Sequence, residues 1–119
     1  MSDELARQLA DLEVKRSRTL ADLETAQAAV ASVRKSMDAF PEQQDDIIQR
    51  FVARLDVDGL PDAERTQIYH AWNEALQESV ATYNDLADER ESLHVQELIL
   101  VRMLAELDAR IRSLKDLLR

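Results

Sequence analysis

Residues 93–118 read LHVQELILVRMLAELDARIRSLKDLL, and they show most clearly how this chain folds. Apolar side chains recur here at spacings of three, four and seven residues, which is the 3.5-residue repeat of a coiled-coil helix. The repeating positions are Leu93, Leu100, Leu104, Leu107, Ile111, Leu114 and Leu118. These side chains share one stripe of the helix, so the stripe must pack against another helix.

The same repeat extends upstream and appears again at the start of the chain. The upstream part of the ladder contains Tyr69, Trp72, Leu76, Tyr83 and Leu86. A second ladder contains Leu5, Leu9, Leu12, Leu23, Ala26, Val30, Val33, Met37 and Phe40. Because a short connector joins the two ladders, we expect two antiparallel neighbouring helices, with the aromatic side chains of residues 69–83 in the core.

The composition favours long helices with few interruptions. One glycine and two prolines occur in 119 residues, so few residues can break a helix. We expect one domain over residues 1–119, with a helix 2–39, a short helix 41–55 opened by Pro41, a loop 56–60 and a long helix 61–118. The predicted fold is all-α: an elongated antiparallel coiled-coil helical hairpin with a short third helix at its tip, assembling into a helical bundle.

Negative charge gathers in the middle of the chain. The net charge is −9, and residues 41–97 carry 14 acidic and 4 basic side chains. Such a surface repels the phosphate backbone, so direct nucleic-acid binding is not expected. The N-terminus has no apolar signal core, and the longest apolar run, residues 98–101, is too short to span a bilayer. We therefore expect a cytoplasmic protein without a membrane partner.

The sequence contains no convincing catalytic or metal-binding pattern. Cysteine is absent, so there is no disulfide scaffold and no thiolate zinc site. Glu91 and His94 have the Glu-x-x-His spacing of di-iron bundles, but the further inward-facing glutamates that such a site needs are missing. His70 has no serine or acid placed to form a catalytic set. We expect no enzyme activity, cofactor or metal.

The long helix carries more apolar residues than one partner helix can cover. Beyond the ladder, its C-terminal half has Val95, Leu98, Ile99, Val101 and Met103. The predicted opposing segment is rich in small residues and includes Leu20 and Ala28. Self-association into a homodimer or higher oligomer is the simplest way to cover these side chains. A hydrophobic docking site for a different protein is the alternative.

Polar residues interrupt both ladders. Arg16 and Thr19 lie on the first ladder, while Arg90 and Glu97 lie on the second. An antiparallel register can place Thr19 opposite Glu97, with Arg16 one layer away. A matched polar layer of this kind would specify the register at some cost in stability. In the alternative interpretation, the long side chains bury only their stems.

The expected loop and the residues that follow it form an acidic tip, with Asp56, Asp58, Asp62 and Glu64. The spacing does not fit an EF-hand, because Gly59 is at position 4 and Gln67 at position 12 when Asp56 is counted as position 1. Carboxylates here can stabilise the N-terminus of the long helix. Alternatively, the exposed tip can contact a basic partner.

Taken together, these patterns favour a non-enzymatic structural or adaptor protein that acts by helix–helix association as a homo-oligomer. One alternative is an acidic regulator or inhibitor whose tip and middle bind a basic surface of a nucleic-acid enzyme such as a polymerase. A further alternative is a small acidic export-type chaperone that covers an amphipathic client helix.

Overall fold

The computed structural model describes residues 2–119, and these residues form three α-helices. Helix α1 spans Ser2–Asp38, α2 spans Phe40–Leu55 and α3 spans Asp62–Leu118. No strand occurs in the described part of the chain, so the predicted all-α fold is confirmed. The helix ends differ from the predicted ones by one residue at most.

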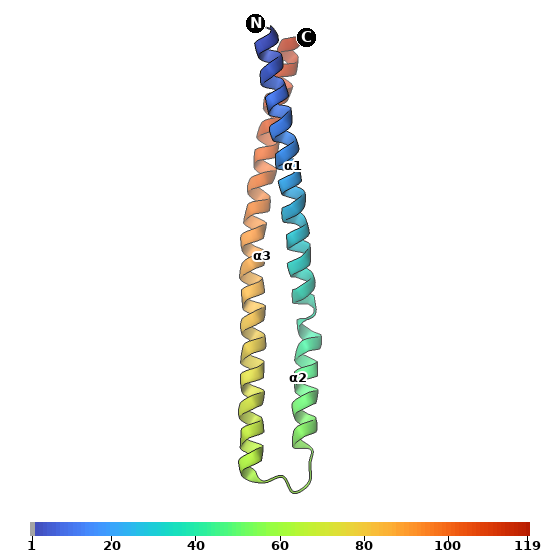
Figure 1. The fold of residues 1–119 in the computed structure, drawn as a ribbon, viewed down its shortest axis with the longest axis vertical. Coiled ribbons are helices and arrows are strands. Elements are labelled where there is room, and N and C mark those ends of the chain that lie inside the picture. Colours follow the sequence, from blue (N-terminus) through green and yellow to red (C-terminus); the bar gives the residue numbers. More distant parts are fainter. Residues whose placement is uncertain (1) are drawn as a thin grey trace. The chain divides into compact units, whose positions relative to one another are not determined.

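The chain packs as two compact units, and α1 and α3 contribute to both. Unit 1 combines residues 1–31 with residues 91–119, and unit 2 comprises residues 32–90. Within unit 1, the start of α1 (blue) lies antiparallel beside the end of α3 (red) (Figure 1). Within unit 2, α2 (green) lies antiparallel beside the first half of α3 (Figure 1).

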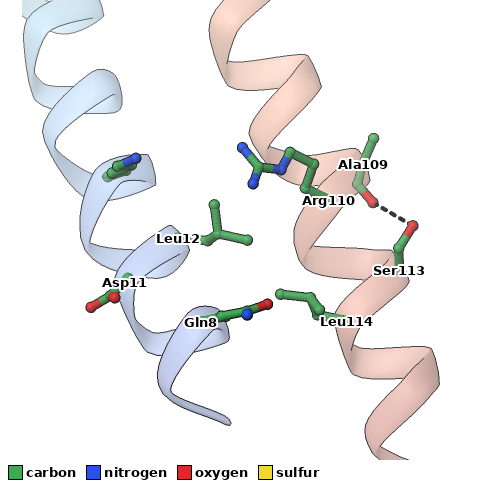
Figure 2. Close-up of a pocket in the computed structure, with 8 residues that line it drawn as sticks. Gln8, Asp11, Leu12, Ala109, Arg110, Ser113 and Leu114 are labelled. Atoms are coloured by element: carbon green, nitrogen blue, oxygen red, sulfur yellow. Dashed lines mark hydrogen bonds between the residues drawn. The ribbon is translucent and has the colours of Figure 1, made fainter. Parts of the chain in front are cut away.

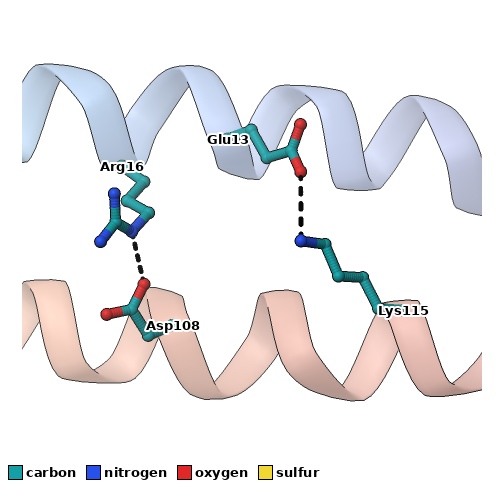
Figure 3. A network of polar contacts seen from close by, with 4 residues as sticks. All are labelled: Glu13, Arg16, Asp108 and Lys115. Carbon is teal, nitrogen blue, oxygen red and sulfur yellow. Dashed lines mark hydrogen bonds and ion pairs between the residues drawn. The ribbon is translucent and has the colours of Figure 1, made fainter.

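The core of unit 1 is a narrow aliphatic seam. Its buried residues are Leu12, Thr19, Leu23, Ala26 and Val30 on α1 and Ile111 on α3. On α1 these positions keep the spacings of three, four and seven that the sequence predicts, so one stripe of the helix is buried. Two ion pairs, Arg16–Asp108 and Glu13–Lys115, join the two helices beside this seam (Figure 3).

The core of unit 2 contains most of the aromatic side chains. Phe40 packs on Tyr83 with ring centroids 4.5 Å apart, and Phe51 stacks on Trp72 at 6.1 Å. Trp72 and Tyr83 are half-buried, and each packs on an aromatic ring of the opposing chain segment. Val33, Met37, Phe51 and Ile68 are the buried apolar residues of this unit. Aromatic pairs of this kind add stability beyond the area that they bury.

Tyr69 departs from its predicted core position. Its side chain is 52% exposed, whereas that of its neighbour Ile68 is only 7% exposed. An α-helix has 3.6 residues per turn rather than 3.5, so a heptad stripe drifts around a straight helix. At this end of α3 the buried stripe has moved by one residue, and the exposed Tyr69 stacks on Trp72 with 6.4 Å between the ring centroids.

A single residue separates α1 from α2. Pro41 has no N–H to donate to the carbonyl of Met37, and its ring crowds that carbonyl, so the helix is interrupted just before it. Ala39 has φ −78° and ψ −10°, and its carbonyl accepts a hydrogen bond from the Gln43 N–H. The buried or half-buried positions Met37, Phe40, Gln44, Ile47 and Phe51 keep the alternating spacing across the interruption.

The loop between α2 and α3 turns at Gly59. This glycine has φ +75°, a left-handed conformation in which other residues are strained. The Asp56 N–H donates to the Val52 carbonyl at 3.0 Å and ends α2. The Arg65 N–H donates to the Pro61 carbonyl at 3.0 Å, so Pro61 provides the first acceptor of α3.

Pairing in twos leaves much of each helix exposed. No large side chain of residues 2–119 is less than 2% exposed. Two helices cover only the side on which they meet, which accounts for this incomplete burial. None of the described helices combines the length with the apolar character that crossing a membrane requires.

Candidate functional site

Five exposed apolar side chains lie within nine residues of each other on α3, in unit 1. We call them the apolar band, and they are Val95, Leu98, Ile99, Val101 and Met103. Each is between 45% and 55% exposed, although all five are large hydrophobic residues. The structure thus places the predicted interface residues of α3 outside the contact between α1 and α3.

The helix geometry explains why this band is not covered. Leu93, Leu100 and Leu104 turn toward α1 and are half-buried. Successive residues are rotated by about 100° around an α-helix, so the residues between these leucines point to the other sides. The band occupies these sides, and α1 cannot cover them.

A groove borders the band on one side, where α1 and α3 meet. We call it the Ile99 groove. It is lined by Asp22, Thr25, Ala26, Ala29, Leu93, Gln96, Ile99 and Leu100. The two alanines have short side chains, so the surface is hollow where they face α3. This groove was not predicted as a unit, although the small residues of α1 were noted in the sequence.

The predicted α1 interface residues lie at different depths. Leu20 is half-buried, while Ala28 is exposed. Ala29, next to Ala28, lines the Ile99 groove and is half-buried. The small-residue surface expected on α1 is therefore present, and Ala26 and Ala29 line the groove between α1 and α3.

The predicted polar layer does not form, because the register of the two helices differs from the expected one. Arg16 Nε donates to Asp108 Oδ1 at 2.5 Å, rather than lying near Glu97 (Figure 3). Both side chains are 41% exposed, so solvent screens this pair. Lys115 Nζ lies 3.9 Å from Glu13 Oε1 in the same unit.

The other predicted members of the layer lie apart from Arg16. Thr19 is buried and lines a groove with Met103 and Leu107, about two helical turns from its expected partner Glu97. Glu97 Oε2 instead lies 3.8 Å from His94 Nδ1 on its own helix. Arg90 is exposed and belongs to unit 2.

A further groove lies where the start of α1 meets the end of α3. In Figure 2, Leu12 and Leu114 point into the space between the helices, with Gln8 and Arg110 beside them. The Ser113 hydroxyl donates to the Ala109 carbonyl of its own helix at 3.1 Å. The lining contains no cluster of nucleophile, base and orienting group, so it suggests packing rather than chemistry.

The acidic tip is an exposed surface of unit 2. Asp56, Asp58, Asp62 and Glu64 are all exposed, and Asp62 and Glu64 occupy the first turn of α3. Negative charge is favourable at a helix N-terminus, so these two residues have a structural role there. Among residues 2–119, no three histidine or carboxylate side chains are grouped so that they could hold a metal ion.

Comparison with known proteins does not extend this description. No protein-family model matches the sequence, and searches of curated proteins and of solved structures find no significant match. The residues and the geometry described above are therefore the basis for the functional argument.

Proposed function

We propose that this chain is a non-enzymatic structural or adaptor protein that acts through helix–helix association and forms a homo-oligomer. The apolar band is the observation that supports this proposal. Five large apolar side chains within nine residues of α3, each about half exposed, are unfavourable in water, and exposed apolar patches of this kind mark interaction sites. The location we propose is cytoplasmic, in keeping with a chain in which 33% of residues are charged.

Light scattering after size exclusion tests the proposal directly. The wild-type chain should show at least twice its 13.6 kDa mass at micromolar concentration. The double variant Ile99→Glu, Val101→Glu should be monomeric, because burying unpaired charge is costly. Arg112→Glu, an exposed change on the same helix outside the band, is the matched control and should leave the mass unchanged. A wild-type chain that stays monomeric at high micromolar concentration would contradict self-association.

The acidic surface of unit 2 supports a second candidate function. Unit 2 carries 13 acidic and 6 basic side chains, and the four carboxylates of the acidic tip are exposed. We propose as an alternative that this surface regulates a partner with a basic face, such as a nucleic-acid enzyme. Binding of that kind should weaken steeply as salt rises, whereas association through the apolar band should not.

A further inference from the structure

The apolar band divides into two flanks of α3. Val95, Ile99 and Met103 are spaced four residues apart and form one ridge along the helix, which we call the Ile99 ridge. Val101 is rotated by about 200° from Ile99, and Leu98 by about 100°, so they lie on other sides. Ile99 and Met103 each line a groove between α1 and α3. The ridge therefore adjoins these grooves, while Val101 faces away from them.

We propose that a second copy of this chain binds antiparallel along the Ile99 ridge, with a two-fold axis at Ile99. Two copies of unit 1 then form a four-helix core. This inference rests on the proposed self-association and adds the surface, the orientation and the stoichiometry. Val101 and Leu98 stay outside this contact.

The ridge has the self-complementary pattern that a two-fold axis requires. Val95 lies four residues before Ile99 and Met103 four residues after it. In an antiparallel copy, Ile99 meets its own equivalent, and Met103 meets Val95 of the second copy. The Arg16–Asp108 contact defines the register of the antiparallel helices α1 and α3. Moving thirteen residues forward along α1 and thirteen back along α3 places Ala29 at the level of Val95. The small Ala29 leaves room there for the longer Met103 side chain.

The charges of the two units favour a second copy at unit 1. Unit 1 carries 11 acidic and 9 basic side chains, so two copies repel each other little, whereas unit 2 carries 13 acidic and 6 basic side chains. Arg102 and Glu106 lie beside the ridge and form an ion pair, with Arg102 Nε 3.8 Å from Glu106 Oε1. The two-fold axis places Arg102 opposite Gln96 of the second copy and Glu106 opposite Ser92 of the second copy. Neither charge therefore faces a like charge.

The exposed area of the chain is sufficient for such a contact. The chain exposes 8979 Å², whereas a compact monomer of 13.6 kDa is expected to expose about 6,600 Å². A standard interface buries about 800 Å² on each partner. The chain therefore exposes enough surface to supply an interface of standard size.

Single cysteines test the geometry, because the chain has no cysteine of its own. Oxidised Ile99→Cys should give a disulfide-linked dimer, since the two sulfur atoms meet at the axis. Val101→Cys, on the opposite flank, is the matched control and should not cross-link. A mixture of Val95→Cys and Met103→Cys chains should link mainly to each other, which mass spectrometry can read. Cross-linking of Val95→Cys to itself would indicate a parallel arrangement and would overturn the proposal.

Charge substitutions test the same surface without oxidation. Ile99→Glu should raise the dissociation constant by about 100-fold or more, while Val101→Glu should leave it within a few-fold of wild type. Equal loss in both variants would show that the interface is not the Ile99 ridge. A wild-type dimer whose Ile99→Cys variant does not cross-link would overturn this geometry alone. A wild-type monomer would overturn self-association as well.

Discussion

Units 1 and 2 use the same antiparallel pairing of helices but differ in what they bury and what they expose. Unit 1 closes around aliphatic residues such as Leu23 and Ile111, and it exposes the apolar band. Unit 2 closes around stacked rings, with Phe51 on Trp72 and Phe40 on Tyr83. The seam of unit 1 is aliphatic and covers one side of α3, so the apolar side chains on its other sides stay uncovered.

The two units also differ in net charge. Unit 1 is close to neutral, while unit 2 has 13 acidic and 6 basic side chains. A nearly neutral apolar surface suits association with an identical chain, and a strongly acidic one disfavours it. This difference favours unit 1 over unit 2 as the surface for the proposed self-association, and it favours unit 2 for the proposed contact with a basic partner.

The largest effect should come from the aromatic core of unit 2. Phe51→Ala removes a buried ring that stacks on Trp72, and it should lower the free energy of unfolding by about 3–5 kcal/mol. Trp72 is the only tryptophan and lies in unit 2, so its fluorescence follows this unit during urea unfolding, while far-UV circular dichroism follows all helices.

Leu23→Ala is the matched change in the core of unit 1. If the units unfold separately, it should shift the circular dichroism transition and leave the tryptophan transition nearly unchanged. Coincident shifts of both signals in both variants would show that the chain unfolds as one cooperative unit and would contradict separate unfolding of units 1 and 2. Protein concentration must be held constant, because association also stabilises the fold.

A smaller effect is expected at the turn of unit 2. Gly59→Ala should destabilise by about 1–2 kcal/mol, because alanine is strained at φ +75°. The space around the added methyl group is open, so the cost is conformational rather than steric crowding. Gly59→Asn is the control and should cost less, since asparagine tolerates this conformation. Equal stability of Gly59→Ala and wild type in urea unfolding would mean that the turn relaxes freely.

The Arg16–Asp108 ion pair of unit 1 should contribute still less to the free energy of unfolding. A double-mutant cycle with Arg16→Ala and Asp108→Ala should give a coupling energy of about 0.5–1 kcal/mol, since both side chains are partly exposed. Arg16→Ala combined with Glu97→Ala is the control and should be additive, because Glu97 lies near His94 instead. Coupling of Arg16 to Glu97 rather than Asp108 would show that the register predicted from the sequence is correct after all.

The smallest effect on stability should come from the acidic tip. Changing Asp56, Asp58 and Asp62 together to asparagine should cost about 0.5 kcal/mol, through the loss of charge at the start of α3. Binding to a basic test protein such as a histone should weaken in the same variant at low salt and differ little from wild type at high salt. Unchanged binding at both salt concentrations would restrict the tip to a structural role in unit 2.

Heptad spacing predicted much of this fold correctly because it reports a local property. Leu12, Leu23 and Val30 are buried where the repeat places them, and the five residues of the apolar band, which lie outside the ladder, are exposed. Pro41 marked the break between α1 and α2, since it removes a donor and crowds a carbonyl within one turn. These features depend only on residues a few positions apart, so the order of residues is sufficient to reveal them.

The register of α1 against α3 could not be read in this way. A shift of one heptad, about two turns, leaves both apolar stripes facing each other, so the pattern fits either register. The structure pairs Arg16 with Asp108 and brings Thr19 beside Met103 and Leu107. The predicted register was shifted by about that amount, and the expected layer with Glu97 was wrong for this reason.

Composition and periodicity were thus enough to establish an all-α chain, its three helices, their buried stripes and the uncovered apolar side of α3. Packing in three dimensions settled which layers meet, why Ile68 rather than Tyr69 is buried, and which small residues make the hollow beside Ile99. The difference has a physical cause. A helix and its apolar stripe arise from neighbours within two turns. The register depends on contacts between residues as distant in sequence as Arg16 and Asp108, and a heptad repeat fits equally well when one helix is shifted by seven residues.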